Sequence, residues 1–164
     1  MKSNIATVIN IAEVAGRFPS ESDLTTMHRY LENGDARLEA AEKLATYHDA
    51  LVRDAGDAVF QRHANLQKPG EGADTQEKVQ KCYRDIAHYL RLVNYCLVTG
   101  NTSPLDEWGI AGARELYRTL KLPTVPYVTA FEYLRDRAHA GLKLSPAALS
   151  ELRFYLDYFI NAMS

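Results

Sequence analysis

The sequence predicts an all-α domain, on three observations. No segment of the 164 residues alternates polar and apolar side chains with the period of two that a half-buried strand requires. Apolar residues recur instead at helical spacing through most of the chain. Glycine, proline and capping residues divide these stretches into eight or nine expected helices. We found no internal repeat and no low-complexity segment.

The chain begins with two short expected helices. Residues 4–15 place apolar side chains at helical spacing and are followed by Gly16, which predicts an amphipathic helix that ends there. Ser20 and Asp23 then approximate a capping box. A second helix should begin at this box and end at Asn33-Gly34.

The next segments form the first half of an expected globin-sized body. Asp35 can cap a helix over residues 36–63, with a break near Tyr47-His48. The stretch from Leu66 to Asp74 contains one proline and two glycines and predicts a loop. Residues 78–100 contain no glycine or proline before Gly100, so they predict one long helix.

The second half contains three further expected helices. Thr102-Ser103-Pro104 combines a hydroxyl cap with a proline in the first turn, and the helix that it starts should finish over residues 113–120. Residues 125–140 form the next helix, which Gly141 ends, and Ser145-Pro146 opens the last one. One face of that last helix is apolar: Leu149, Leu152, Leu156, Phe159, Ile160 and Met163.

Length and charge restrict the class of protein. At 164 residues, the simplest organisation is one domain over residues 1–164, with a hairpin at 1–34 and a globin-like body at 35–164. The hairpin is too small to be stable alone, so it should pack on the body or, as the sharper hypothesis, on another subunit. The net charge is −2 with scattered basic residues, which predicts no nucleic-acid surface. No apolar run suits a transmembrane segment or a signal peptide, so we expect a soluble intracellular protein.

Enzymatic activity is not expected. The sequence contains no GxSxG, HExxH or phosphate-loop signature, and its five histidines stand apart from one another. Haem binding would need an axial ligand, usually histidine, on a helix that faces residues 78–100. Residues 106–120, which would supply that ligand, contain no histidine.

The helix at residues 78–100 carries the most informative pattern. At 100° per residue, one stripe within about 80° of Cys82 collects Asp85, Ile86, Tyr89, Leu90, Val93, Cys96 and Leu97. Cys96 is expected to be a core residue, and at roughly 21 Å along the helix it is too distant for a disulfide with Cys82. A carboxylate in an apolar stripe needs a partner, so Asp85 requires an explanation.

Two explanations of this pattern are open from spacing alone. In the first, Asp85 pairs with Lys81 and Cys82 is a core residue. In the second, Cys82 attaches a cationic aromatic ligand whose charge Asp85 balances. The residues that would hold carboxylates of such a ligand are Arg84, Lys81 and His88, and those that would wall its flat rings are Trp108, Tyr117 and Tyr127.

The motif KCYRDIAHYLRL, residues 81–92, resembles the chromophore-attachment motif of phycobiliproteins, which are antenna proteins that carry open-chain tetrapyrroles. The resemblance is greatest to phycoerythrin α subunits and covers essentially the whole chain. It includes VAGRFPSESDL, ARLEAAEKLA, NYCLVTGNTSPLDEWGIAGARELYR and YLDYFINAMS. The fold that it implies is globin-like with an N-terminal helical hairpin.

The resemblance also implies roles for individual residues. Cys82 would carry phycoerythrobilin, or a related bilin isomer, through a thioether, and Asp85 would bond the inner pyrrole nitrogens. Arg84 would meet a propionate. The remaining pocket positions that match are Lys81, His88, Trp108 and Tyr127.

The function implied is that of a light-harvesting subunit without enzymatic turnover, which passes excitation energy to neighbouring pigments. Its expected partners are a β subunit, contacted through the hairpin, and linker polypeptides, with αβ heterodimers assembling into trimers and hexamers. Its expected place is the cytoplasmic or stromal surface of a cyanobacterial or red-algal thylakoid. The alternative is a bilin-free or sensory relative of the same fold that acts as an interaction module.

One position departs from the pattern of phycoerythrin α subunits. These usually have a second bilin cysteine in the segment that reads RDRAHAGLKLS here, and His139 stands at that place. Histidine forms no such thioether, so a single bilin is expected, although Arg137 remains as a candidate pocket residue. One-bilin α subunits are the rule in phycocyanin and allophycocyanin.

Overall fold

A computed structural model describes residues 4–112, 119 and 123–164 of the chain. Helices connected by turns and loops make up these residues, which include no strand, so the all-α prediction is confirmed. None of the helices in these ranges combines the length and the apolar character that crossing a bilayer requires. The expected helical segment at 113–120, including Tyr117, falls almost entirely outside the described residues.

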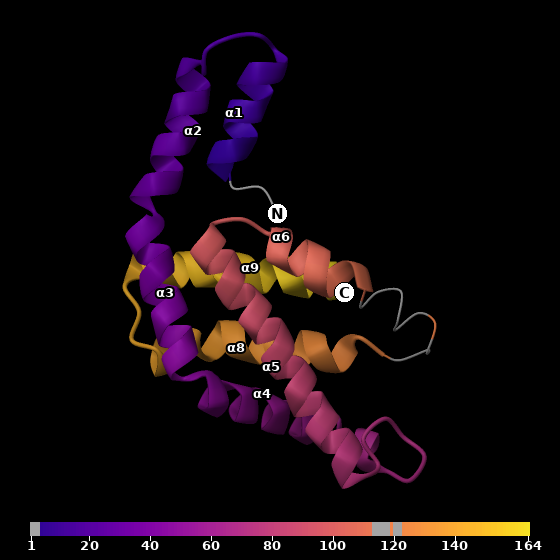
Figure 1. Cartoon of the computed structure of the whole chain (residues 1–164). Helices are drawn as coiled ribbons and strands as arrows, with labels where there is room; N and C mark the ends of the chain where they lie inside the picture. Colours follow the sequence, from indigo (N-terminus) through magenta and orange to yellow (C-terminus); the bar gives the residue numbers. More distant parts are fainter. Residues whose placement is uncertain (1–3, 113–118, 120–122) are drawn as a thin grey trace.

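The two N-terminal helices, α1 (Asn4–Val14) and α2 (Glu21–Glu32), form a hairpin that extends away from the body (Figure 1). The predicted capping box is confirmed. The Ser20 hydroxyl accepts a hydrogen bond from the backbone N–H of Asp23 (3.2 Å), and the Asp23 carboxylate accepts one from the Ser20 N–H (2.7 Å). No residue of α2 is buried, so this helix contributes little to the core.

Helix α3 (Gly34–Thr46) follows α2 after a single residue, Asn33, so the two run on almost in line (Figure 1). The expected cap at Asp35 is wrong: the helix begins one residue earlier, with Asn33 at the cap position and no side-chain cap bond. Asp35 lies in the first turn instead. The predicted break near Tyr47-His48 is confirmed, because α4 (His48–Arg62) begins there.

Helix α5 (Gln76–Thr99) is the long central element, reached through a short 3₁₀ turn, η1 (Ala64–Gln67), and a loop. The Thr75 hydroxyl caps its first turn by accepting a hydrogen bond from the N–H of Lys78 (3.3 Å). Gly100 ends it in the left-handed conformation with φ of 64°. α5 packs against α3, α4 and the last helix of the chain, so it lies at the centre of the body (Figure 1).

The remaining elements are a short turn α6 (Ser103–Leu105), a π-helical turn η2 (Asp106–Ile110), α8 (Val125–Gly141) and α9 (Pro146–Met163). The expected hydroxyl cap at Thr102 does not form. The Thr102 hydroxyl donates to Asp106 Oδ2 (2.8 Å), and Asn101 Oδ1 accepts the Ser103 N–H (3.0 Å). Ser145 caps α9 as predicted, with its hydroxyl accepting the Ala148 N–H (3.2 Å).

One hydrophobic core joins α3, α4, α5, α8 and α9. The predicted apolar face of α9 is confirmed, since five of its six residues are buried and Leu149 packs at the margin; the buried five are Leu152, Leu156, Phe159, Ile160 and Met163. Gly56 of α4 lies directly under the ring of Tyr83 of α5, where a Cβ atom would overlap that ring. This contact fixes how closely α4 and α5 approach beside the first turns of α5.

A cluster of Tyr30, Arg37 and Gly100 joins the hairpin to the body. The Tyr30 hydroxyl donates to the carbonyl oxygen of Thr99 (3.0 Å), and the Arg37 guanidinium lies over the Tyr30 ring at 4.5 Å. Arg37 is only 6% exposed and donates to the carbonyl of Tyr30 (2.8 Å), while its Nε has no hydrogen-bond partner among the described residues. A side chain at position 100 would overlap Tyr30, so this contact requires glycine.

Candidate functional site

Helix α5 presents the predicted stripe to the core. Of its members, Ile86, Tyr89, Leu90, Val93, Cys96 and Leu97 are buried. Cys82 and Asp85 lie one turn apart at the N-terminal end of the stripe, where burial is incomplete. The Asp85 side chain is 31% exposed, so the carboxylate lies at the edge of the apolar region and not within the core.

A cavity of about 200 Å³ opens at this end of α5. Cys82 and Asp85 both line it, together with Tyr127 from the first turn of α8. The loop before α5 closes one side. The remaining lining residues are Val59, Leu66, Gly72, Ala73, Lys78, Lys81, Arg84, Ile86, Pro123 and Pro126.

The two cysteines differ in environment. Burial, and then the charge of Asp85, raises the pKa of the half-buried Cys82 thiol. At neutral pH this sulfur therefore remains a thiol, open to the cavity but weakly nucleophilic. Cys96 is fully buried, and burial raises its pKa to about 12, as expected of a core residue.

Both oxygens of Asp85 accept hydrogen bonds. Oδ1 accepts from Arg84 Nη2 (3.1 Å) and Nε (3.3 Å), and Oδ2 accepts from the Tyr127 hydroxyl (3.2 Å). The pairing of Asp85 with Lys81, one of the two explanations open from the sequence, does not occur. Lys81 bonds Glu77 instead (2.6 Å).

Each cation that lines the cavity is paired with an acid. Lys78 Nζ lies 2.7 Å from Asp74 Oδ1, Lys81 is held by Glu77, and Arg84 by Asp85. These pairs are partly exposed, with side-chain exposures of 45%, 51% and 70% for the three cations. Exposed pairs are weak, so each cation can exchange its partner at little cost.

The structure does not bring every predicted residue to the cavity. His88 lies one turn beyond Arg84 on α5, where its Nδ1 pairs with Arg91 (3.2 Å). Trp108 is 54% exposed and packs edge-on against Tyr95, with ring centroids 6.4 Å apart. Arg137 lies over the ring of Tyr133 at 5.8 Å. Tyr117 is outside the described residues, as is the side chain of His139.

Comparison with known proteins identifies the family. The sequence model of the phycobilisome protein family matches residues 7–163, nearly the whole chain. The chain belongs to this family. It is 59% identical over its full length, and over the full length of the relative, to the C-phycoerythrin class 1 subunit alpha of Synechococcus sp. (strain WH7803). The R-phycoerythrin alpha chain of Pyropia tenera is 57% identical and the B-phycoerythrin alpha chain of Rhodella violacea 56% identical, again over both full lengths.

These matches confirm three expectations drawn from the sequence. The chain is related to phycoerythrin α subunits, it has the all-α globin-like fold of phycobiliproteins, and it is a light-harvesting subunit of the phycobilisome. The attachment site and the roles of its residues remain predictions, which the geometry above supports at Cys82, Asp85, Arg84, Lys81 and Tyr127.

Sequence reasoning missed several residues that line the cavity of this phycobilisome protein. Lys78 carried a usable signal, because it lies one turn before Cys82 on the same helix as Lys81. Gly72 and Ala73 in the loop, and Pro123 and Pro126 near the start of α8, carried none. They reach the cavity through the packing of α4, α5 and α8, which no local pattern specifies.

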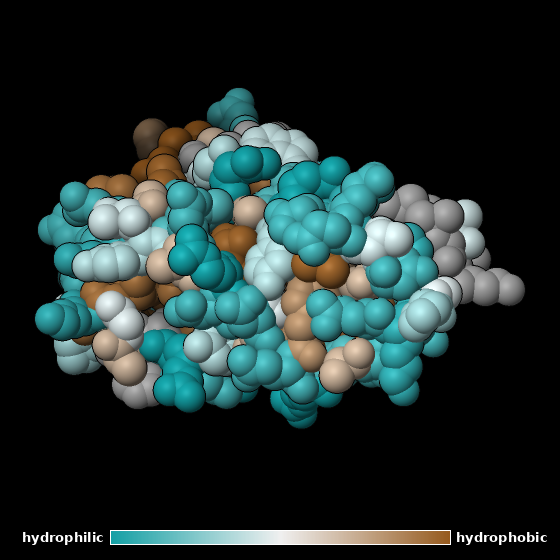
Figure 2. Space-filling view, turned by 90° about the horizontal axis from the view of Figure 1, so that it is seen from below, coloured by the Kyte–Doolittle hydropathy of each residue, from teal (hydrophilic) through white to brown (hydrophobic). Residues whose placement is uncertain are grey.

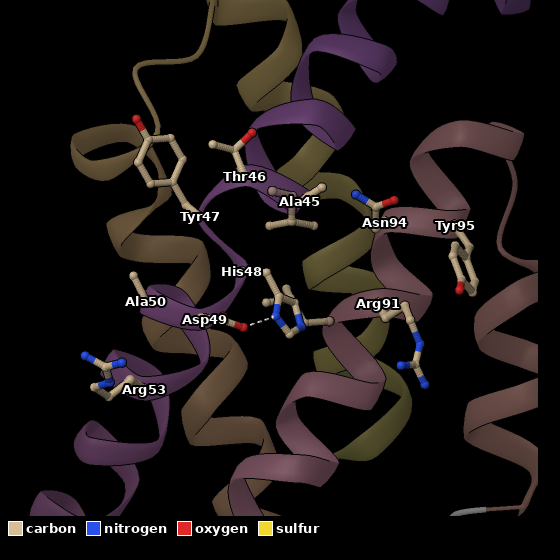
Figure 3. A pocket seen from close by; sticks show the side chains of 12 residues that line it. Ala45, Thr46, Tyr47, His48, Asp49, Ala50, Arg53, Arg91, Asn94 and Tyr95 are labelled. Carbon is tan, nitrogen blue, oxygen red and sulfur yellow. Dashed lines mark hydrogen bonds and ion pairs between the residues drawn. The ribbon is translucent and has the colours of Figure 1, made fainter.

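A second and larger groove, of about 690 Å³, lies where the break between α3 and α4 faces α5. Figure 3 shows the ring of His48 between α4 and α5, with Arg91 and Asn94 on the α5 side. His48 pairs with Asp49 (2.9 Å), whereas Arg53 adds a cation on α4. Two exposed aromatic residues, Tyr47 and Tyr95, also line this groove.

The face seen from below in Figure 1 is mainly hydrophilic, with apolar side chains showing between the hydrophilic ones (Figure 2). Among the described residues, no cluster of histidine, cysteine and acidic side chains suits a metal ion.

Proposed function

We propose that this phycobilisome subunit carries one open-chain tetrapyrrole, phycoerythrobilin or a related isomer, through a thioether to Cys82. The observation that carries the proposal is the shared cavity of Cys82 and Asp85. A half-buried thiol and a carboxylate one turn apart open into one mainly apolar pocket. A thiol provides a covalent anchor, and a carboxylate balances a protonated ring system in a poorly solvated place.

The size of the cavity supports partial enclosure of such a pigment. About 200 Å³ is less than the roughly 300 to 1,000 Å³ of most ligand pockets. The enclosed part therefore suits the inner rings beside Asp85, while the rest of the ligand would lie along the surface of α5. His88 lies one turn beyond Arg84 in that direction, which supports its predicted role.

The chemistry of attachment requires no oxidant. The sulfur and the proton of the Cys82 thiol add across one carbon–carbon double bond, so that an S–C bond and a C–H bond form. Because the raised pKa of Cys82 keeps the sulfur protonated at neutral pH, we expect attachment to need an external catalyst that removes the proton.

When bound, a conjugated tetrapyrrole supplies the absorption of visible light, and the residues of the chain restrict its twisting. Cys82 fixes one end. Asp85 would accept hydrogen bonds from the inner nitrogens, and Arg84 and Lys81 would bind propionates, for which a guanidinium is well suited. Each contact removes a torsional freedom through which the excitation would be lost.

The two cysteines provide a matched test of the attachment site. Cys82→Ala should give a folded protein without covalent pigment, measured as intact mass and as pigment fluorescence after a denaturing gel. Cys96→Ala is the control and should retain one bilin. Pigment on the Cys82→Ala variant would show that the assignment is wrong. A mass corresponding to two bilins on the wild type would refute the single-bilin prediction from His139.

The role of Asp85 has its own test. Asp85→Asn preserves the shape of the side chain but removes its charge, so attachment should persist while the visible band shifts or weakens. An unchanged absorption spectrum would remove Asp85 from the mechanism.

We further propose that the hairpin contacts a β subunit. Helices α1 and α2 expose large apolar side chains at Ile9, Ile11, Val14, Leu24 and Leu31. Such a set is typical of a surface that another protein covers. Ile11→Asp should reduce recovery of the heterodimer with a co-expressed phycoerythrin β subunit, measured by size-exclusion chromatography. Phe154→Ser, which removes an exposed apolar residue of α9, is the control.

The groove between the α3–α4 break and α5 supports a second contact with the same partner. Its exposed tyrosines and its arginines, Arg53 and Arg91, are residue types that dominate binding energy at interfaces. Arg53→Ala should therefore weaken the heterodimer, more at low than at high salt. Together with linker polypeptides, such heterodimers would form the trimers and hexamers of an antenna peripheral to the thylakoid membrane.

A further inference from the structure

We propose that Tyr127 is a positioning residue for Asp85, and that its hydroxyl fixes the carboxylate in the orientation in which it receives the pigment. The proposal rests on the proposed function of the cavity. It concerns a contact between α8 and α5 whose two residues are 42 positions apart in the sequence. Tyr127 lies outside the motif around Cys82.

The first step is that the hydrogen bonds from Arg84 to Asp85 are weak. Arg84 is the neighbouring residue on the same helix, and its side chain is 70% exposed. A pair with such a long, solvated side chain contributes little and is easily exchanged. If Arg84 turns to a propionate, as proposed above, Oδ1 loses this bond when the pigment binds.

The second step is the rigidity of Tyr127. Its backbone N–H donates to the carbonyl of Thr124 (2.9 Å) at the start of α8. Its ring meets Tyr89 edge-on, with centroids 5.8 Å apart, and Tyr89 packs at 4.9 Å against the fully buried Phe159. A series of aromatic contacts thus connects the Tyr127 hydroxyl to the core of the body.

The third step is the position of the contact. The Tyr127 hydroxyl donates to Oδ2 of Asp85 (3.2 Å), and both residues line the cavity that contains Cys82. A carboxylate oxygen can accept more than one hydrogen bond, so Oδ2 can keep Tyr127 and still accept from a pigment nitrogen. Tyr127 therefore holds the acid while Arg84 is released.

The test compares Tyr127→Phe with Tyr83→Phe. Each change removes one phenol hydroxyl that donates to a carboxylate, because Tyr83 bonds Asp57 (2.6 Å) on α4, away from the cavity. In the pigment-loaded protein, Tyr127→Phe should retain one covalent bilin by intact mass. Its fluorescence quantum yield should fall about twofold or more, because one hydrogen bond that restricts Asp85 is lost. Tyr83→Phe should keep the wild-type yield.

A second measurement uses pigment-free protein. Tyr127→Phe should raise the unfolding equilibrium constant in urea by about fivefold, the effect of one hydrogen bond, and by much less when Asp85→Ala is also present. Two results would overturn the proposal: equal effects of Tyr127→Phe in both backgrounds, or equal emission yields for the two tyrosine variants. Absence of covalent pigment from the wild type would instead refute the proposed function, and the pigment-free measurement would still decide the role of Tyr127.

Discussion

Replacement of Gly100 by alanine should destabilise the protein through the contact between the hairpin and the body. With φ of 64°, Gly100 is in the left-handed region, which costs a residue with a Cβ about 1 kcal/mol. The new Cβ would also overlap the Tyr30 ring and lie 3.0 Å from Arg37 Nε. Displacing Tyr30 loses its hydrogen bond to Thr99, about 1 kcal/mol, and its contact with the Arg37 cation, about 1 kcal/mol more.

Together these contributions lower the free energy of unfolding by about 3 kcal/mol. If that free energy falls by about 2 kcal/mol per M of urea, the unfolding midpoint falls by about 1.5 M. Gly70→Ala is the matched control, because Gly70 also has a positive φ but no atom of the described residues within 4 Å of the place that a Cβ would occupy. Its midpoint should fall by only about 0.5 M. In a Tyr30→Ala background, Gly100→Ala should lose most of its cost beyond the backbone strain, because only Arg37 still lies close to the new Cβ. Equal shifts for the two glycine variants, or an undiminished cost without Tyr30, would refute the reasoning.

Three further predictions concern other parts of the body. Hydrogen bonds from the Ser145 N–H, and to a smaller extent from its hydroxyl, lower the pKa of the Glu39 carboxyl below 4.5. The ionised carboxylate therefore stabilises the fold above the ordinary glutamate pKa, and this stabilisation is lost as the pH falls through the lowered pKa. Glu39→Gln should therefore lower the urea midpoint at neutral pH, and the difference from the wild type should vanish in acid. In pigment-free protein, iodoacetamide should modify Cys82. Cys96 should react only after unfolding, because it is buried and burial raises its pKa to about 12. Peptide mass spectrometry distinguishes the two cysteines, and early labelling of Cys96 would contradict its burial. Gly109→Ala places a Cβ 2.8 Å from Leu92 Cδ1 and should cost about 1 to 3 kcal/mol in chemical unfolding. Gly112→Ala, where no atom of the described residues lies within 4 Å of the new Cβ, should not destabilise. Equal effects would contradict the close packing of η2 on α5.

Local patterns were sufficient to predict the helices and the stripe of α5. The period of 3.6 residues placed Ile86, Leu90, Val93 and Leu97 on one face, and all four are buried. The break at Tyr47-His48 was likewise predicted, and α4 begins there. These features depend on residues within one or two helical turns of each other, which is the distance over which sequence periodicity is informative.

The ion pairs within the site were harder to predict from the sequence. Helical spacing allowed Lys81 to pair with Asp85, but the same side chain reaches Glu77 equally well at one turn in the other direction. Adjacent residues of a helix do not face each other, yet the long side chain of Arg84 reaches Asp85. The angular position of a residue around the helix axis does not determine which neighbour a long, flexible side chain contacts.

Contacts between distant segments could not be predicted from spacing at all. Tyr30 and Thr99 are 69 residues apart, and Tyr127 and Asp85 are 42 apart. The resemblance to phycobiliproteins predicted that Tyr127 is a pocket residue, but it did not predict the hydrogen bond from Tyr127 to Asp85. Such contacts follow from the angle at which whole helices cross, which many core residues set together.

The ion pairs around the cavity have a consequence for the order of assembly. Lys78, Lys81 and Arg84 are each neutralised by a nearby acid before any ligand arrives. The pigment-free chain therefore needs no ligand to balance these three charges when it folds. If the proposed pigment binds through its carboxylates, these would replace the three acids as partners of the cations, and binding would weaken as the salt concentration rises.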